Sequence, residues 1–108
     1  MACAACSGSS FIDKVVINNP TAYDTRIEIS GQSRNDWTPL ATIPANSQVV
    51  VQEVYDEGDT WVFRFGYLHF QKEMEVSRTQ LAHGNWRITV PASFGSELEA
   101  RGVTPPPS

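Results

Sequence analysis

The strongest constraint on the fold of this chain is the alternation in residues 60–67, which follow an acidic turn. Trp61, Phe63, Phe65 and Tyr67 occupy every second position of this segment. Because successive side chains of a β-strand point to opposite faces, this spacing places all four aromatic rings on one face. Each ring can remove roughly 150–250 Å² of surface from water. Residues 60–67 are therefore predicted to be the strand around which the core forms.

Apolar or β-branched runs separated by turn residues predict further strands on either side of this segment. They are residues 11–18, 25–30, 37–43, 48–55, 72–77 and 86–90. Turn signals recur about every 8–12 residues, which is typical of a β-sandwich. No long helical pattern separates the strands, and this argues against parallel βαβ folds. We therefore expect an all-β fold, an antiparallel sandwich of about seven strands, with a small β-barrel as the alternative.

Two of these predicted strands have features that indicate their place in a sheet. Pro39 interrupts residues 37–43, and a proline without an amide donor favours an edge strand or a bulge. Residues 48–55 carry valines at both even and odd positions. Valines on both sides favour a strand that is covered on both faces.

A short helix is predicted immediately before the last strand. Ser77 and Gln80 have the spacing of a capping box, in which each side chain bonds the backbone of the other. We expect this helix to cross between the two sheets. Residues 96–102 repeat the start and stop signals of a small helix, with Phe94 and Leu98 as its apolar anchors.

The chain is organised as one domain between two extensions. Residues 1–10 are small and are predicted to be a flexible leader, and residues 11–91 contain all the predicted strands of the sandwich domain. Residues 92–108 form a C-terminal extension with the second helix and a proline-rich end. A length of 108 residues with 41% hydrophobic content is sufficient for a single core.

Charge and motif content exclude several classes of function. The net charge of −4 does not support sequence-independent binding to nucleic acid, which needs a basic face. The sequence contains no Gly-x-Ser-x-Gly elbow, no phosphate-binding loop and no His-Glu-x-x-His motif. We therefore expect a chain that is not an enzyme and needs no cofactor. No apolar run approaches the ~18 residues that span a bilayer.

Cys3 and Cys6 are the cysteines of the chain, and two residues separate them. Redox motifs with this spacing begin a helix in a βαβ unit, and zinc needs about four ligands, so neither chemistry is favoured here. Cys6 follows Ala4 and Ala5 and precedes a serine and a glycine. This segment is similar to the end of a bacterial lipoprotein signal, in which such a cysteine receives lipid. Cys6 is therefore a candidate lipid attachment site, with the membrane segment expected upstream of residue 1.

The order of strand ends and turns along the domain resembles that of a known family. Asn19-Pro20 ends the first predicted strand, the turn at residues 44–47 reads Pro-Ala-Asn-Ser, and residues 58–65 lead into the aromatic strand. This order resembles immunoglobulin-like domains of uncharacterised, actinobacterial-type membrane-tethered extracytoplasmic proteins. Unlike antibody domains, residues 11–91 contain no cysteine. The resemblance implies an interaction or spacer domain in the cell envelope, with an unidentified protein partner. A cytoplasmic location is the alternative.

A group of acidic residues around one turn is a candidate calcium site. Glu53, Asp56, Glu57 and Asp59 lie close together in the sequence, and carboxylate oxygens are the ligands that Ca²⁺ prefers. Their spacing is not that of a dedicated 12-residue calcium loop. The plainer interpretation is a solvated hairpin tip.

Trp37 is a candidate aromatic for stacking on a sugar ring. It follows Asp36 at the end of a polar loop, whereas Trp61 and Trp86 share faces with apolar neighbours and are assigned to the core. The alternative function is therefore a ligand-binding module for carbohydrate or calcium. Because open sandwiches expose strand edges, a homo-oligomer formed through such an edge is a further expectation.

Overall fold

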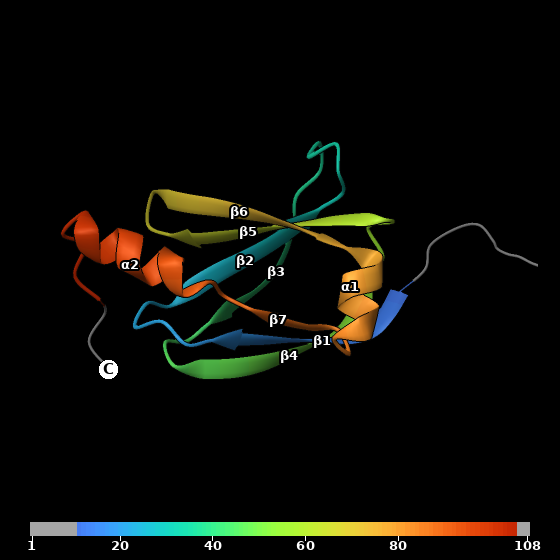
Figure 1. Ribbon diagram of the computed structural model, residues 1–108, viewed down its shortest axis with the longest axis horizontal. Helices are drawn as coiled ribbons and strands as arrows, with labels where there is room; N and C mark the ends of the chain where they lie inside the picture. Colours follow the sequence, from blue (N-terminus) through green and yellow to red (C-terminus); the bar gives the residue numbers. More distant parts are fainter. Residues whose placement is uncertain (1–10, 106–108) are drawn as a thin grey trace, which may run out of the picture.

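The computed structural model describes residues 11–105 as two β-sheets packed face to face, with a short helix near each end (Figure 1). The elements in chain order are β1 (Phe11–Asn19), β2 (Thr25–Ser30), β3 (Thr38–Ile43), β4 (Ser47–Tyr55), β5 (Thr60–Tyr67), β6 (Phe70–Ser77), α1 (Arg78–His83), β7 (Arg87–Thr89) and α2 (Ala92–Ala100). The prediction of a seven-stranded all-β sandwich with a short helix before the last strand is confirmed. The predicted leader, with Cys3 and Cys6, lies outside the described residues.

The larger sheet has the strand order β3-β2-β5-β6, and the smaller sheet has the order β4-β1-β7. Neighbouring strands are antiparallel except β1 and β7, which run parallel. Antibody constant domains place their fourth strand in the sheet of their second and fifth strands. Here β3 belongs to the sheet of β2 and β5, and β4 belongs to the other sheet. The likeness to immunoglobulin domains is therefore one of two-sheet architecture.

The aromatic face of β5 forms the centre of the core, as the alternation predicts. Trp61, Phe63 and Phe65 are fully buried, and Tyr67 packs against them at the rim. The rings of Phe63 and Phe65 are stacked with their centroids 6.5 Å apart. Val62 points to the opposite face of β5 and is also fully buried. The outer face of the larger sheet must therefore be covered at this point.

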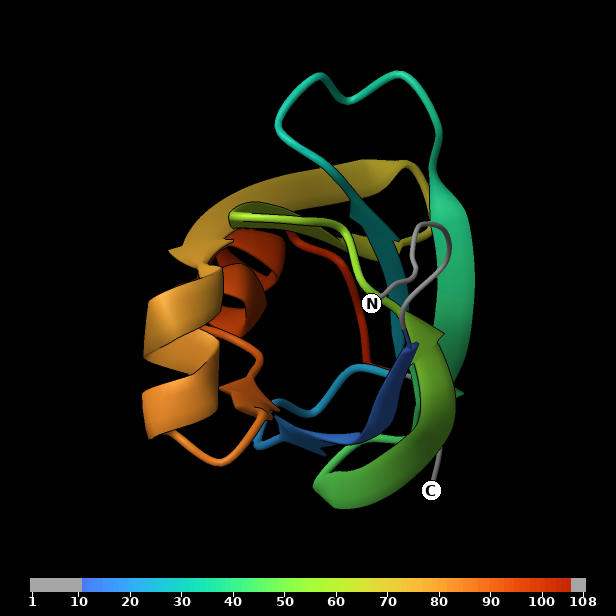
Figure 2. The same cartoon turned by 90° about the vertical axis from the view of Figure 1, so that its right-hand side faces the viewer.

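The smaller sheet and the helices complete the core from the other side. They contribute Val15, Ile17, Val54, Leu81, Ile88, Phe94 and Leu98. Viewed end-on, α1 bridges from β6 to β7 and closes the open side of the sandwich at one end (Figure 2). The capping box predicted for α1 is present, because Ser77 and Gln80 bond each other's backbone reciprocally. Neither helix of the described chain has the length and apolar character required to cross a bilayer.

Helix α2 begins four residues before its predicted start. Pro91 occupies the N-cap with φ −59°, and its fixed φ suits a helix entry. Ser96, which looked like a cap, lies inside the helix, and its hydroxyl donates to the carbonyl oxygen of Ala92. The predicted anchors Phe94 and Leu98 are both fully buried. The anchors were predictable because their spacing is helical, whereas a serine inside a helix imitates a start signal.

The valines of β4 are not covered on both faces, contrary to expectation. Val49 and Val51 pack against the core, whereas the side chain of Val50 is 48% exposed. Glu53 has a left-handed φ of 52°, and this conformation interrupts the alternation of the strand. Val54 consequently turns inward and is buried. The irregular residue thus accounts for the burial of Val54, whereas Val50 keeps the outward orientation of the regular alternation.

The proline in β3 lies where a proline is tolerated in a sheet. Pro39 is opposite Glu28, and the register of β2 against β3 shifts between Ile27 and Glu28. Strand β3 is also at the edge of the larger sheet. Both predicted alternatives, an edge strand and a bulge, therefore apply to β3. β6 starts two residues before its predicted start, because the turn at Leu68, with φ 54°, pairs Tyr67 directly with Phe70.

Candidate functional site

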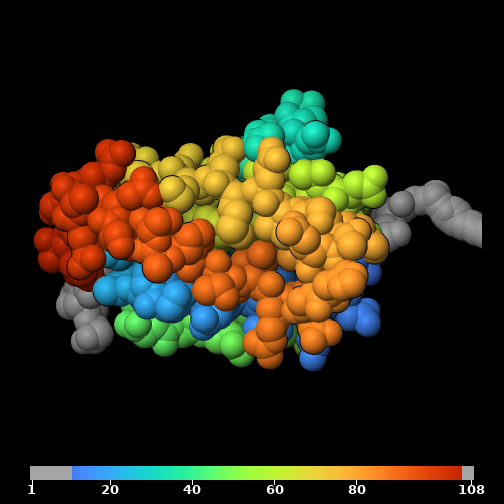
Figure 3. All heavy atoms as spheres, viewed as in Figure 1, coloured from blue at the N-terminus to red at the C-terminus, as the bar shows by residue number. Residues whose placement is uncertain are grey.

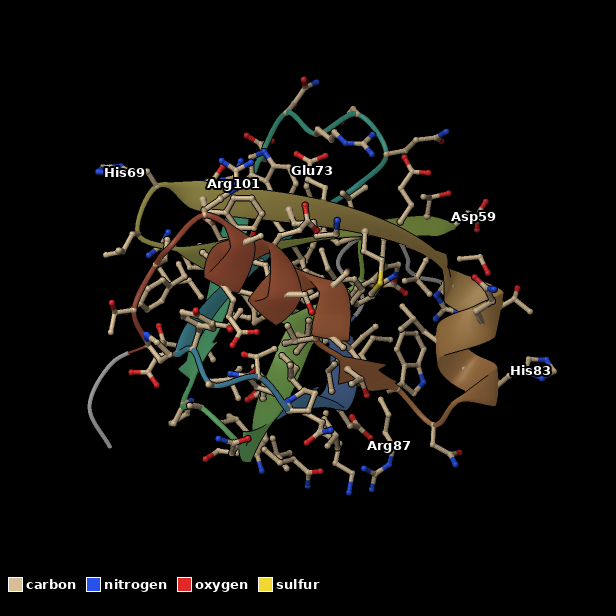
Figure 4. All side chains as sticks on the ribbon, turned by 60° about the vertical axis from the view of Figure 1, so that its left-hand side comes forward. Asp59, His69, Glu73, His83, Arg87 and Arg101 are labelled. Carbon is tan, nitrogen blue, oxygen red and sulfur yellow. The ribbon has the colours of Figure 1, made fainter. Side chains whose placement is uncertain are left out.

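The β2–β3 loop, residues 31–37, covers part of the outer face of the larger sheet. It rises above β5 and β6 in Figure 1 and protrudes from the surface in Figure 3. From it, Arg34 Nε donates to Glu73 Oε1 at 2.9 Å and Arg34 Nη2 donates to Glu75 Oε2 at 2.5 Å. Figure 4 shows Glu73 on the β6 side that faces this loop. The two glutamates raise the pKa of Arg34, so the loop is held to β6 by a permanent cation.

The same loop places Trp37, the predicted sugar-stacking residue, against Arg64 of β5. The guanidinium carbon of Arg64 lies 4.0 Å from the centroid of the Trp37 ring. Arg64 also bonds Glu28 Oε1 through Nε at 2.9 Å and Nη2 at 2.8 Å. Stacking of a guanidinium on an indole is favourable and orients both groups. Trp37 is consequently half-buried, and the ring face away from Arg64 is the face on which a ligand would stack.

The acidic turn between β4 and β5 is organised by Asp56. Its Oδ1 accepts from the backbone N–H of Gly58 at 2.9 Å, and its Oδ2 accepts from Arg78 Nε at 3.0 Å. Gly58 has a positive φ of 98°, which glycine adopts without steric cost. Its carbonyl oxygen accepts from Trp61 Nε1 at 3.1 Å. Asp56 therefore connects this turn to α1, and its oxygens are occupied by protein donors.

Glu57 connects the acidic turn with the β2–β3 loop. Burial raises the pKa of Glu57, and the negative charges of Asp56 and Asp36 raise it further. A Cβ atom added to Gly31 would lie 3.3 Å from the Glu57 carbonyl oxygen, so the two segments touch. The structure thus brings the two predicted ligand sites to one end of the sandwich. The sequence contains no signal for this proximity, because the segments are separated by two strands.

The four predicted calcium ligands do not point to a common centre. Glu53 and Asp59 are exposed, Asp56 pairs with Arg78, and Glu57 is half-buried. Within residues 11–105, no three side chains of the metal-ligating types gather around a point. Calcium binding therefore stays a prediction that would require the turn to rearrange.

The histidines lie at opposite ends of the molecule. His69 is in the turn between β5 and β6, and His83 is the last residue of α1. Both point outward in Figure 4.

A groove between the β5–β6 turn and the end of α2 was not foreseen. Its volume is about 630 Å³, and its lining is Tyr67, Leu68, His69, Phe70, Gln71, Leu98, Arg101 and Val103. The side chain of Leu68 is 62% exposed. The guanidinium of Arg101 lies 4.7 Å from the Phe70 ring centroid. The apolar residues on both sides of His69 are the one sequence signal that could have indicated this groove.

Comparison with known proteins identifies no relative of this chain. No protein-family model matches it, and no curated protein or solved structure is significantly similar to it. The residues and contacts described above therefore carry the functional proposal.

Proposed function

We propose that this chain is a non-enzymatic spacer or interaction domain of a bacterial envelope protein. The observation that supports this role most directly is the path of the chain through the sandwich. β1 starts at the end covered by α1, and the residues after α2 leave at the opposite end (Figure 1). A domain with this path can join what lies before it to what lies after it along one line.

The first and last strands are connected in a way that suits a spacer under load. β1 and β7 are parallel neighbours, with Val16 N–H donating to Trp86 O and Val90 N–H donating to Asn18 O, each at 2.9 Å. A pull on the two ends of the domain would slide these strands along each other. Hydrogen bonds loaded in shear share the force, because all must lengthen together.

The C-terminal exit is anchored as well. The hydroxyl of Tyr23 donates to the carbonyl oxygen of Val103 at 2.6 Å, and Phe94 and Leu98 are buried in the core. Force applied beyond residue 103 would therefore reach the sandwich and not simply unravel α2.

Single-molecule pulling tests the spacer role. Handles at Phe11 and Val103 load β1 and β7 in shear, whereas handles at Phe11 and Gly84 pull the same strands apart from one end. We expect a clearly higher unfolding force in the first geometry. Equal forces in both geometries would remove the support for a load-bearing spacer.

The envelope location rests on the lipoprotein-like segment that ends at Cys6. Labelling of the full-length natural protein with radioactive palmitate tests it, with Cys6→Ser as the variant and Cys3→Ser as the matched control. We expect label in the wild type and in Cys3→Ser and none in Cys6→Ser. An unlabelled wild type, or a gene with no hydrophobic segment upstream of residue 1, would contradict the tether and favour the cytoplasmic alternative.

Glycan binding at Trp37 is the second candidate function. It is favoured by the fixed orientation of the indole ring, since Arg64 stacks on one side and bonds Glu28 on the other. Melting curves with and without cell-wall glycans test it, because a ligand of the native state raises the melting temperature. The rise should disappear in Trp37→Ala. A parallel series with Ca²⁺ and Asp59→Asn tests the acidic turn. If the melting temperature does not change at a saturating concentration of a ligand, binding of that ligand is ruled out.

A further inference from the structure

The free edge of β4 offers unpaired backbone groups in a definite pattern. Within β1, Val16 N–H and Asn18 O bond toward β7. Backbone groups of successive strand residues alternate between the two edges of the strand. The other residues of β1, Val15, Ile17 and Asn19, therefore bond toward β4.

The pairing of β1 with β4 determines which residues of β4 bond toward β1. Val15, Ile17 and Asn19 lie opposite Val51, Val49 and Ser47. Those three residues of β4 consequently direct their N–H and C=O groups to β1. The intervening residues, Gln48, Val50 and Gln52, direct theirs to the free edge. Along the described part of the chain, their backbone groups make no hydrogen bond outside the β1 ladder.

From Gln48 to Gln52 this edge lacks the usual protection against pairing, since the irregular residue Glu53 lies just beyond that stretch. Natural sheets protect their edges with prolines, lysines, bulges or very short strands. On the same side of the sandwich, β3 has Pro39 and a register shift. β4 is nine residues long and contains neither proline nor lysine. Its solvent face carries Val50, whose side chain is 48% exposed.

The sequence of β4 reads the same in both directions around Val50. Residues 48–52 are Gln-Val-Val-Val-Gln. A two-fold axis at Val50 would place it opposite its own copy, and Gln48 opposite Gln52 of the second copy. All three edge-facing residues would then be paired, and each pair would exchange two hydrogen bonds. The charged residue Glu53 would lie opposite Ser47, so no like charges meet.

We propose that two copies of this chain associate through antiparallel pairing of β4 about Val50. The product is one continuous sheet with the order β7-β1-β4-β4-β1-β7, related by a two-fold axis. The mirrored sequence favours a second copy over a different partner strand, because only self-pairing matches glutamine with glutamine and valine with valine throughout. The pairing requires neither the envelope location nor the spacer role, so its failure would leave those proposals untouched.

Sedimentation velocity of the full chain across a dilution series tests the pairing. Val50→Lys and Val50→Glu each place like charges opposite one another at the two-fold axis. Each should weaken self-association by at least about ten-fold. An equimolar mixture of the two variants should restore a dimer, because opposite charges then face each other. The Val50 side chain points to solvent, so both variants should retain the wild-type circular dichroism and melt cooperatively.

Leu68→Lys is the matched control, since it adds the same charge at another exposed apolar side chain, far from β4 in the sequence, and should leave association unchanged. A wild type that sediments as a monomer up to about 1 mM chain would overturn the proposal. Association that survives Val50→Lys but is lost in Leu68→Lys would also overturn it, because contact would then be made through the groove beside α2. A mixture of the two Val50 variants that stays monomeric would count against the two-fold register.

Discussion

The side-chain amide of Asn19 donates to the carbonyl oxygen of Tyr23 at 2.7 Å, across the connection between β1 and β2. It also donates to Ile43 O at 3.0 Å, at the end of β3. Its Oδ1 accepts from the hydroxyl of Thr21 at 2.7 Å and from the Thr21 N–H at 3.0 Å. Asn19 is fully buried, and both ends of its amide are satisfied. One side chain therefore connects three strand ends of the two sheets.

Asn19→Ala should lower the free energy of unfolding by roughly 3 kcal/mol, because it leaves buried carbonyls and an amide without partners. Urea denaturation measures the loss. Asn18→Ala, on the neighbouring and less buried residue, is the control and should change stability by about 0.5 kcal/mol or less. A loss in Asn19→Ala no larger than in Asn18→Ala would show that water replaces the network.

Gly95→Ala should destabilise the protein although alanine is the better helix former. A Cβ at Gly95 would lie 3.2 Å from Thr21 Cβ and 3.3 Å from Thr21 Cγ2. Thr21 cannot move away easily, because its hydroxyl is bonded to Asn19. Overpacking of this kind costs about 1–3 kcal/mol, which outweighs the ~1 kcal/mol gained in helix propensity. Thermal melting should show a lower midpoint in Gly95→Ala, and an unchanged or higher midpoint in the exposed control Ser96→Ala.

Glu57→Gln should stabilise the protein at neutral pH and have no such effect in acid. Burial, Asp56 and Asp36 raise the pKa of Glu57 above its ordinary value of 4.5. The unfolded chain therefore releases this proton first, and stability falls as the pH rises through the folded pKa. Glutamine removes that penalty at pH 7, whereas well below pH 4.5 the wild-type carboxyl is protonated in both states.

Denaturant titrations of wild type and Glu57→Gln at neutral and acidic pH measure this difference. Asp59→Asn removes the same charge from the same turn and separates the effect of net charge from that of burial. A stability gain in Glu57→Gln that persists at low pH would contradict a cause in ionisation.

Arg34→Ala should release the β2–β3 loop with little effect on global stability. Exposed ion pairs contribute about 0–1 kcal/mol, and the Arg34 side chain is 35% exposed. The expected result is faster hydrogen exchange in residues 31–37 with a melting temperature close to that of the wild type. Lys72 is on the same strand as the partners of Arg34, but it pairs with Glu97 of α2. Lys72→Ala breaks that pair and should leave exchange in the loop unchanged. Identical exchange in both variants would show that the ion pairs of Arg34 do not hold the loop.

The candidate site was predictable only in its parts. Trp37 and Glu57 stood out in the sequence through their neighbours, but their meeting at one end of the sandwich did not. Their loops touch where Gly31 lies beside Glu57, and these loops leave different strands.

The sequence by itself determined the seven strands, the capped helix and the buried face of β5, because side-chain period, turn residues and caps act between near neighbours. Only the tertiary structure decided that β4 pairs with β1 and β3 with β2. It also decided that β1 runs parallel to β7, and that β4 keeps a free edge. Strand pairing depends on which backbone groups meet across long stretches of chain, and every strand offers the same donors and acceptors. The order of the sheets therefore follows from how all the elements bury their apolar faces together.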